Sequence, residues 1–599
     1  MDGMWQKLLK VDLSQEKVKE EPIKEEVAQR YLGGNGLGIY ILYNEMDGRP
    51  SAFAEETPLI FVPGLLNGSG IPLSGKSGFY SKSPLTGIMG EGFFGGALGA
   101  EVKKAGYDAV VIKGSCQETS YLLIDGTGAE IKKGTELEGL GTEKTEEILQ
   151  ERHGGSVGVI GPAGENLVLF ACIAGDGRQV GRTGLGAVMG SKKLKGIVGV
   201  GEKEIVPYDS EQMNALKKKA ITELKDGKGK EAYHGYSQYG TAKFSEVASD
   251  EFGIFPTEYW RKGSFEHAKD IATYAWKQQV SKKNACYGCI IACGQMYKGL
   301  VDVEYETTFS LGSNLRIGDI EEIAKANYLC DDLGLDTLSM GNVIGFLMDL
   351  SQRGILKEDL SFGQAETVHE LIRKTAWKQG IGKIAAEGVK RIAEKYGAED
   401  NAVHVKGIDP PAYDVRAIKG MGLSFYTSTR GACHLRSDCD GIELGGGTTP
   451  NERGEWKNMV KDRLSSEGKE YIAWRENYVT LHDTLGTCKF TRSVYSPSFM
   501  SIFVNAYTGL ATTGKDLLKI GERIYNLERL YNLSQRPEIK TELHIPKQFT
   551  HSSPSKQAQG SSLTREELTK MLQAYYTARG WNEKGEPRPE KLEELEITV

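Results

Sequence analysis

The sequence lacks the features that mark membrane, secreted and nucleic-acid-binding proteins. No apolar run approaches the roughly 20 residues that a membrane helix needs. The opening MDGMWQKLLKVDLSQEK has neither an apolar signal core nor a cleavage site. Basic residues are not in excess, because 74 Lys and Arg stand against 81 Asp and Glu, a formal net charge of −7. We therefore expect a cytoplasmic protein with no membrane span and no nucleic-acid partner.

Cysteine is sparse and unevenly placed. The chain of 599 residues holds nine cysteines, an odd number, and three of them fall between positions 286 and 293. Such a group favours metal binding over a disulfide framework in a large protein without a signal peptide. The compartment is expected to be reducing.

The order of predicted elements indicates an α+β chain of three domains. Residues 1–207 hold short apolar or alternating runs, between Gly- and Pro-containing turns, that predict strands. These runs are KLLKVDL, PLIFVPG, DAVVIKG, YLLIDG, VGVIG, LVLFACIAG and KGIVGVG. From residue 208 apolar residues recur three and four apart, as in amphipathic helices. The Pro-rich GIDPPAYD at 408–415 divides this helical part into domains at 208–410 and 411–599.

Cys286, Cys289 and Cys293 form a C-x-x-C-x-x-x-C motif, the strongest local signal in the sequence. Thiolates at this spacing can wrap one face of an iron–sulfur cubane whose fourth ligand is remote in the chain. Zinc is the competing occupant, but a closed zinc site needs a fourth Cys or His, and none is near. Three buried, unligated thiols are the alternative without a metal. The motif predicts a [4Fe-4S] cluster.

CDDLGLDT at 330–337 and HDTLGTCK at 482–489 share one pattern. Each ends a helical segment with Asp-x-x-Gly and places a polar residue two positions after the glycine, Asp336 in one and Cys488 in the other. Helix capping explains either copy alone. Two copies indicate a site of approximate twofold character, and they favour Cys488 as the fourth cluster ligand. The competitors for that position are Cys433 and Cys439.

The segment from Gly70 to Ser77 reads G-x-x-x-x-G-K-S, the pattern of a phosphate-binding loop. That pattern holds a nucleotide only if a helix follows, because the helix N-terminus supplies the N–H dipoles. Gly78, Pro84 and Gly87 make such a helix unfavourable. We expect no nucleotide hydrolysis, and a glycine-and-lysine loop for another anionic group.

Glycine is abundant, with 75 residues, about one in eight, against a usual share of roughly 7%. It is concentrated in loops at 92–99 and 177–190, neither of which reads G-x-G-x-x-G, so a Rossmann dinucleotide site has little support. The second loop carries Arg182, and fixed positive charge near it would suit a phosphate or sulfur-rich ligand. Solvated lysines on a β-turn are the structural alternative. The basic residues that follow Arg182 are Lys192, Lys193 and Lys195.

Together these motifs resemble the aldehyde:ferredoxin oxidoreductases, tungsten enzymes with two pyranopterin-dithiolene cofactors. The resemblance spans nearly the whole chain, in family order. Its segments are YLGGNGLG, KSPLTG, GFFGG, GENLVLFACIAGDGRQVGRTGLGAVMGSKKLKGI, the C-x-x-C-x-x-x-C motif, VEYETTFSLGSNLRI, DDLGLDT, RGACHLR, DTLGTC and YYTARGWNEKGEP. It implies an N-terminal β-saddle domain followed by two mainly helical domains that clasp the pterins.

The resemblance also implies roles for individual residues. Glu306 in VEYETT and His434 in ACHLR match the acid/base residues beside the metal. The implied pterin contacts are Lys76, Gly95, Arg182, Thr183, Asp331, Leu335, Asp336, Arg436, Asp483 and Thr487. The implied cluster ligands are Cys286, Cys289, Cys293 and Cys488.

The cofactors so implied are a [4Fe-4S] cluster and a tungsten (or molybdenum) bis-pyranopterin, with magnesium bridging the pterin phosphates. The implied activity is oxidation of aldehydes to carboxylic acids, or the reverse. Electrons would pass to ferredoxin or to iron–sulfur or flavin subunits, in a homodimer or hetero-oligomer. One alternative is the catalytic subunit of a benzoyl-CoA-reductase-like complex. A non-catalytic iron–sulfur relay is the other, although a relay needs only the cysteines and not the paired Asp-x-x-Gly segments.

Three positions depart from the family pattern. Lys76 stands where better-known members carry Arg, so the charge is kept but the planar fork is lost. Thr487 replaces the usual Leu. Lys325 occupies the position of a Glu that helps to bind an interface iron in one member, so that iron and that dimer are not implied here.

Overall fold

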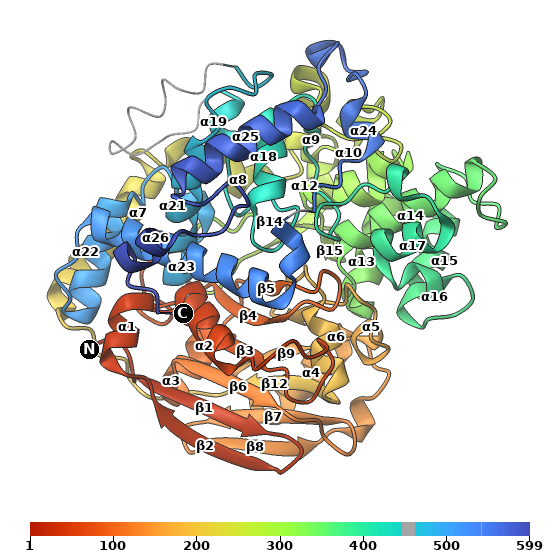
Figure 1. Ribbon diagram of the computed structural model, residues 1–599. Coiled ribbons are helices and arrows are strands. Elements are labelled where there is room, and N and C mark those ends of the chain that lie inside the picture. The colour runs from red at the N-terminus through yellow and green to blue at the C-terminus, as the bar shows by residue number, and fades with distance from the viewer. Residues whose placement is uncertain (446–461, 541, 599) are drawn as a thin grey trace.

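The computed structural model describes residues 1–445, 462–540 and 542–598. Twelve of its fifteen described strands lie between residues 7 and 199, and the rest of the chain is mainly helical (Figure 1). This confirms the predicted α+β class, with a sheet domain first and helical domains after it. Within these ranges, no helix combines the length and apolar character that a bilayer crossing demands.

The N-terminal domain is built from two six-stranded sheets. The first has the order β2-β1-β6-β3-β4-β5, and the second has the order β11-β10-β9-β12-β7-β8. Each contains one parallel pair, β1–β6 or β7–β12, and is otherwise antiparallel. The strands are β1 (Lys7–Asp12), β2 (Lys17–Pro22), β3 (Leu59–Pro63), β4 (Ser77–Lys82), β5 (Met89–Phe94), β6 (Ala109–Lys113), β7 (Ser120–Asp125), β8 (Gly128–Lys133), β9 (Ser156–Val159), β10 (Ile173–Gly175), β11 (Arg178–Val180) and β12 (Leu194–Gly199).

Apolar side chains of both sheets form one core between them. Phe61 and Phe79 of the first sheet, with ring centroids 4.8 Å apart, share it with Leu122 and Ile197 of the second. LVLFACIAG, predicted as one strand, is extended only at its end, in β10. The helices of this domain are α1 (Glu25–Tyr31), α2 (Gly34–Glu45), α3 (Leu98–Ala105), α4 (Thr142–His153), α5 (Pro162–Glu165) and α6 (Leu185–Ser191).

The middle of the chain is helical, with one small sheet beside the cysteine motif. That sheet has the order β13-β14-β15, from β13 (Val280–Asn284), β14 (Gly294–Tyr297) and β15 (Val301–Asp302). The helices are α7 (Ser210–Lys225), α8 (Lys230–Tyr239), α9 (Phe244–Val247), α10 (Ala268–Ile271), α11 (Thr273–Trp276), α12 (Tyr305–Thr307), α13 (Ile320–Leu333), α14 (Thr337–Gln352), α15 (Ala365–Ala376), α16 (Gly382–Ala385) and α17 (Gly388–Tyr396).

The last part of the chain packs on the sheet domain and on the middle helices. α23 lies against α2 and α21, above the first sheet in Figure 1. Trp260 contacts both Phe309 and Phe549, so one apolar core runs across residue 410. The boundaries at 207 and 410 stay predictions. The described helices here are α18 (Lys419–Thr427), α19 (Asp440–Glu443), α21 (Tyr471–Leu485), α22 (Pro497–Thr508), α23 (Gly514–Gln535), α24 (Lys547–Thr550), α25 (Arg565–Ala578) and α26 (Pro589–Glu594).

Candidate functional site

The two Asp-x-x-Gly segments have the same backbone form. α13 ends at Gly334 and α21 at Gly486, with φ of 76° and 77°, a left-handed conformation that glycine adopts readily. Each of these glycines accepts a backbone hydrogen bond from the sheet domain through its carbonyl. Cys172 N lies 2.9 Å from the Gly334 oxygen, and Lys76 N lies 2.9 Å from the Gly486 oxygen. Both helix ends therefore contact the sheet domain through the backbone carbonyl of the equivalent glycine.

Asp336 fixes the first helix end to Arg182. Its carboxylate accepts hydrogen bonds from Leu338 N at 3.1 Å and Ser339 Oγ at 2.7 Å, and so caps α14. Arg182 Nε lies 3.2 Å from the same carboxylate. Arg182 also donates to the Asp409 carbonyl at 2.8 Å, which ties the loop after β11 to the helical part.

The residue after Arg182 is held in an unfavourable conformation. Thr183 has φ of 73°, is fully buried, and is followed by Gly184 with φ of 79°. A β-branched residue with positive φ is an outlier that marks strain held by its surroundings. Its hydroxyl donates to the Glu91 carbonyl at 3.2 Å.

The three lysines that follow this loop do not join Arg182. Lys192 donates to the Gly114 carbonyl at 3.4 Å, and Lys193 donates to the Gln117 carbonyl at 2.7 Å. Lys195 donates to the Leu140 carbonyl at 2.7 Å and pairs with Glu165. These lysines bind acceptors of their own domain, so the interpretation that they supply charge to a ligand beside Arg182 is wrong.

Asp331, in the first helix end, is buried near two other acidic side chains. Asn327 Nδ2 donates to its carboxyl group at 2.8 Å. Burial, with the negative charges of Asp302 and Glu304, raises the pKa of Asp331 well above its usual value. Leu335, from the same segment, is buried and bridges to Ala171 of the sheet domain.

Asp483, in the second helix end, lies among cations instead. Its Oδ2 is 3.0 Å from Lys489 Nζ and 3.5 Å from Arg436 Nη1, whereas its Oδ1 is buried without a hydrogen bond. Thr487 N donates to the His482 carbonyl at 2.8 Å, and the Thr487 hydroxyl lies 2.8 Å from His482 Nδ1.

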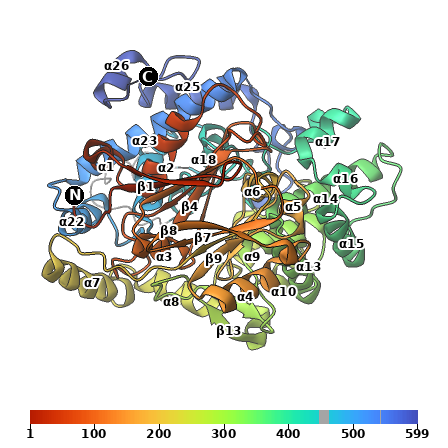
Figure 2. The same ribbon diagram turned by 90° about the horizontal axis from the view of Figure 1, so that it is seen from below.

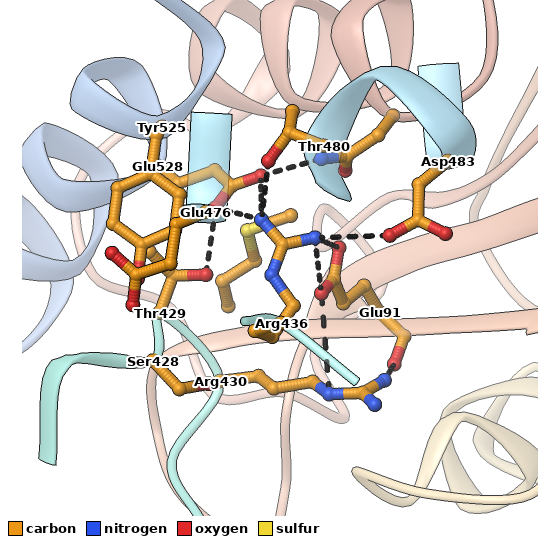
Figure 3. A network of polar contacts seen from close by, with 12 residues as sticks. Glu91, Ser428, Thr429, Arg430, Arg436, Glu476, Thr480, Asp483, Tyr525 and Glu528 are labelled. Atoms are coloured by element: carbon orange, nitrogen blue, oxygen red, sulfur yellow. Dashed lines mark hydrogen bonds and ion pairs between the residues drawn. The ribbon is translucent and has the colours of Figure 1, made fainter. Parts of the chain in front are cut away.

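Arg436 is the centre of a buried polar network (Figure 3). Its guanidinium lies 3.1 Å from Glu91 and 2.6 Å from Glu528, and Asp483 approaches it from α21. Arg430 donates to the Glu91 carbonyl at 3.1 Å and to Cys433 Sγ at 2.7 Å. Sequence reasoning found Arg436 and Asp483 but missed the other charged members. These are Glu91, Arg430 and Glu528.

Burial dominates the electrostatics of this network. It raises the pKa of Glu91 to about 7, although Arg436 opposes the shift. The cysteine competitor Cys433 is engaged here by Arg430, and Cys439 is fully buried next to the start of α19.

Two loops of the sheet domain hold the cysteine motif. Leu73 N donates to the Gly288 carbonyl at 3.0 Å, and Cys488 N donates to the Leu73 carbonyl at 2.8 Å. Leu73 thus joins the motif to the second helix end. A Cβ on Gly95 would lie 2.3 Å from Cys286 Sγ, so this position admits only glycine. Gly95, an implied pterin contact, thus lies against Cys286, an implied cluster ligand.

The structure brings Cys488 beside the other three cysteines. Burial raises the pKa of Cys286, Cys289 and Cys293, to about 11 for Cys289, and the negative charge of Cys488 adds to each shift. Neither Cys433 nor Cys439 is among the charges that raise the pKa of these three thiols. The arrangement is the donor set that the motif predicts for an iron–sulfur cluster.

The spacing of the thiols argues against a single zinc ion. A tetrahedral zinc ion with Zn–S of about 2.3 Å brings its sulfurs to roughly 4 Å from one another. Among the described residues, the one group of three or more potential ligand atoms within 4.8 Å of each other is Glu322, Glu366 and His369, not the cysteines. Lys325, which replaces the Glu of the family pattern, forms a surface ion pair with Glu322 of this group, with Nζ 2.7 Å from the carboxylate.

Lys76 lies between the cysteines and Asp483. Burial alone would lower the pKa of its ammonium, but the negative charges of Cys488, Cys286 and Asp483 outweigh burial and raise it. The residues that follow Lys76 form strand β4, not a helix. The expectation that this loop is not a nucleotide-binding P-loop is therefore supported by its context.

Glu306 and His434 form a close pair. His434 Nε2 is 3.5 Å from Glu306 Oε1, and the side chains are 17% and 18% exposed. Ala412 N donates to Glu306 Oε2 at 2.9 Å, while Oε1 makes no hydrogen bond. Burial raises the pKa of Glu306 to about 8 and lowers the pKa of His434 well below its usual value. Near neutral pH both groups are therefore uncharged.

Several buried side-chain polar atoms of the site residues make no hydrogen bond with another described residue. Buried side-chain atoms normally find a hydrogen-bond partner, because an unmade bond costs about 1–3 kcal/mol. A Cβ built on Gly181, next to Arg182, would meet no atom within 4 Å. Both observations fit a bulky polar cofactor between the two helix ends. The buried atoms without a hydrogen bond include Glu306 Oε1, Asp483 Oδ1, Arg178 Nε, Arg430 Nε and Arg436 Nε.

The sheet domain, the paired helix ends and the four thiols together define a cofactor-dependent oxidoreductase. Two family models match the chain, the aldehyde ferredoxin oxidoreductase N-terminal domain over residues 8–201 and domains 2 and 3 of the same family over residues 215–597. The chain belongs to the aldehyde ferredoxin oxidoreductase family.

Relatives that match the whole chain are named as oxidoreductases. The tungsten-containing aldehyde ferredoxin oxidoreductase of Thermococcus kodakarensis is 36% identical, over 100% of this chain and 99% of its own length. The aliphatic sulfonate oxidoreductase, WOR-like subunit, of Pyrococcus furiosus is 31% identical over 99% and 96%. A solved structure, the active site complex BamBC of benzoyl coenzyme A reductase with 1,5-dienoyl-CoA, shares the fold. Its TM-score is 0.85 at 22% identity, covering 100% of this chain and 97% of the other.

Proposed function

We propose that the chain oxidises aldehydes to carboxylic acids, or catalyses the reverse reaction, with a tungsten (or molybdenum) bis-pyranopterin and a [4Fe-4S] cluster. Electrons leave through the cluster to ferredoxin or to a partner subunit. The observation that carries the proposal is the buried Glu306–His434 pair, whose carboxyl oxygen Oε1 makes no hydrogen bond with a described residue. The name of the Thermococcus kodakarensis relative supports it.

The residues that would hold the cofactors come from both helix ends. Asp331, Leu335 and Asp336 would contact one pterin, and Asp483 with Thr487 the other. When bound, the metal cofactor would supply two-electron chemistry and the cluster would supply one-electron transfer. Lys76, Gly95, Arg182, Thr183 and Arg436 would complete the pterin site. The cluster would be ligated by Cys286, Cys289, Cys293 and Cys488.

Glu306 is suited to move a proton at its free oxygen. Conversion of an aldehyde to an acid adds a water-derived oxygen to the carbonyl carbon, so a nearby base must accept a proton. Glu306 Oε2 is fixed by the amide of Ala412, which leaves Oε1 to exchange that proton. A pKa of about 8 makes the group a far better base than an ordinary carboxylate once it is ionised.

His434 is suited to orient the substrate. Its imidazole is neutral, because burial and the nearby Arg430 and Arg182 lower its pKa. A neutral imidazole presents one N–H, and that donor can stabilise negative charge that develops on the substrate oxygen. Tyr413, with its ring centroid 5.3 Å from that of His434, packs against the imidazole.

The test is viologen-coupled oxidation of aliphatic and aromatic aldehydes under anoxic conditions, with iron, tungsten and molybdenum quantified. We expect turnover of at least one aldehyde class by protein holding four iron atoms and one tungsten or molybdenum. Metal-loaded protein that is inert to every aldehyde would contradict the proposal. Iron without either heavier metal would favour the non-catalytic relay.

The fold shared with the BamBC complex makes an aryl-CoA reductase subunit the second candidate. That activity requires electron-supplying partner subunits and a thioester substrate. Reduction of an aryl-CoA thioester by the metal-loaded protein with its partners, without aldehyde turnover, would replace the first candidate by the second.

A further inference from the structure

The cysteine motif reaches the protein surface at one aromatic residue. Tyr287 is 36% exposed, and Gly288 beside it is exposed as well, whereas Cys286 and Cys289 on either side are partly buried. Tyr287 N donates to the Gly95 carbonyl at 2.9 Å, and the Gly288 carbonyl accepts from the Leu73 amide at 3.0 Å. The exposed edge is therefore fixed in place directly beside the thiols.

Lysines from three separate segments border this edge. Lys104 Nζ, on α3, lies 5.9 Å from the Tyr287 ring centroid. Lys217 Nζ, on α7, lies 3.1 Å from the position that a Cβ on Gly70 would take. The carbonyl oxygen of the next residue, Ile71, lies 4.0 Å from the position of a Cβ on Gly288, so Lys217 is near the exposed edge. Lys282 and Lys283 belong to strand β13, which leads into Cys286.

Most of this positive charge has no counter-charge. Lys104 pairs with Glu101 at 3.1 Å. Lys217, Lys282 and Lys283 are exposed and form no ion pair with any residue that the structure describes; Lys283 donates to the Ser237 hydroxyl at 3.2 Å. The chain as a whole carries a net charge of −7. The unpaired lysines around one exposed aromatic residue therefore form a locally positive surface on a negatively charged protein. An aromatic centre with a charged rim is the usual composition of a transient protein interface.

We propose that Tyr287, with Lys104, Lys217, Lys282 and Lys283, is the docking surface for a small acidic iron–sulfur protein that carries one electron. The inference rests on the proposed function and names the surface through which its electrons leave. Electron transfer falls steeply with distance, and this edge lies between two of the proposed cluster ligands. An aldehyde and water give an acid, two protons and two electrons, so two carriers dock and are reduced in turn for each aldehyde oxidised.

The experiment uses the metal-loaded enzyme and an acidic [4Fe-4S] ferredoxin as the probe. Lys217→Glu/Lys283→Glu is compared with Lys357→Glu/Lys383→Glu, two exposed lysines that likewise form no ion pair with a described residue. The control positions follow α14 and lie in α16, on the opposite side of the molecule from α7 (Figure 2). Because electrostatic steering changes association by 10-fold or more, we expect the KM for ferredoxin to rise about 10-fold at low ionic strength in the first variant only.

The increase should shrink as salt is added, since the screening length is about 10 Å at 0.1 M. Turnover with benzyl viologen should be unchanged. An equal rise in KM for the control variant, or none in the test variant, would overturn the proposal. If the enzyme oxidises no aldehyde at all, the proposed function fails, but the docking surface is still tested by the Kd for oxidised ferredoxin, which should weaken about 10-fold in the first variant alone.

Discussion

The two helix ends of the site share a backbone turn but differ in the charge around it. The part of the site near Gly334 holds titratable groups whose ionisation is opposed by burial, although Asp336 pairs with Arg182 there. Burial raises the pKa of Asp331 well above its usual range and that of Glu306 to about 8, and it lowers the pKa of His434. We call Glu306, His434 and Asp331 the proton half of the site.

The surroundings of Gly486 are rich in paired charge. Asp483 lies between Lys489 and Arg436, and Lys76 extends the row of cations to the cysteines. We call Asp483, Lys489, Arg436, Lys76 and the four clustered cysteines the electron half.

The difference suggests a division of labour on a common scaffold. Glu306, with a pKa of about 8, can gain or lose a proton near neutral pH, which general acid–base catalysis requires. Fixed cations cannot, but they stabilise the negative charge of thiolates and of reduced metal centres. A duplicated backbone turn thus holds two environments with different chemistry.

The largest effect is expected for Cys488, the proposed fourth cluster ligand in the electron half. Cys488→Ser should yield protein without a stable [4Fe-4S] cluster, seen as loss of iron and of the EPR signal of the reduced state. Cys433→Ser and Cys439→Ser are the matched controls and should keep both. A Cys488→Ser protein with four iron atoms and a normal signal would make our fourth-ligand assignment wrong.

In the proton half we expect a loss of rate without a loss of metal. Glu306→Gln keeps the shape of the side chain but removes the base, so kcat should fall by about 10²–10⁴-fold. His434→Asn should lower kcat by about 10²–10³-fold, as for a donor to a developing oxyanion. Iron and tungsten contents should equal those of the wild type. Near-normal aldehyde turnover in Glu306→Gln would reject the assigned role and direct the search to another base.

Asp331 and Asp483 occupy equivalent positions in the two helix ends, so replacing each one compares the two environments through protein stability. Asp483→Asn removes a carboxylate that pairs with both Lys489 and Arg436 and should cost about 3 kcal/mol. Asp331→Asn replaces an acid whose ionisation is opposed by burial, beside Asp302 and Glu304, with an uncharged amide and should change stability by less than about 1 kcal/mol. Thermal unfolding of both variants at equal metal content measures the difference. Equal losses would show that the two environments do not differ as described.

The smallest expected effect is the change of kcat/KM for aldehyde oxidation with pH. A base must be ionised to act, and Glu306, with a pKa of about 8, is protonated below that pH. The kcat/KM for aldehyde oxidation should therefore rise with pH, about 10-fold per unit below 8, and level off above it. The rising limb should be absent in Glu306→Gln. A wild-type profile that is flat between pH 6 and 8 would contradict the raised pKa.

Sequence patterns predicted the elements whose apolar periodicity is local. Runs such as DAVVIKG became β6, and the helical periodicity that begins at residue 208 includes α13. Strands β4 and β5 were not predicted, because their glycines read as turn signals. In the fold these glycines allow close packing, since a Cβ on Gly92 would lie 2.4 Å from Val180.

The site was predictable only as far as its motifs reach. The cysteine motif and the repeated Asp-x-x-Gly pattern indicated residues that the structure brings together. Glu91 and Glu528 carry no motif, and they meet Arg436 from positions 345 and 92 residues away. Such contacts depend on tertiary packing, which periodicity and spacing do not encode. The lysines after Arg182 show the converse, because nearness in sequence did not make them part of the site.

The most direct test of the central claim, that protons and electrons are handled by different halves of the site, is the rate of cluster reduction in single turnover. Anoxic stopped-flow absorbance would follow the cluster of metal-loaded wild-type and Glu306→Gln enzyme after mixing with aldehyde or with dithionite. We predict that dithionite reduces both clusters at the same rate, whereas aldehyde reduces the variant's cluster about 10²–10⁴-fold more slowly. Equal slowing with both reductants, or no slowing with aldehyde, would contradict the claim.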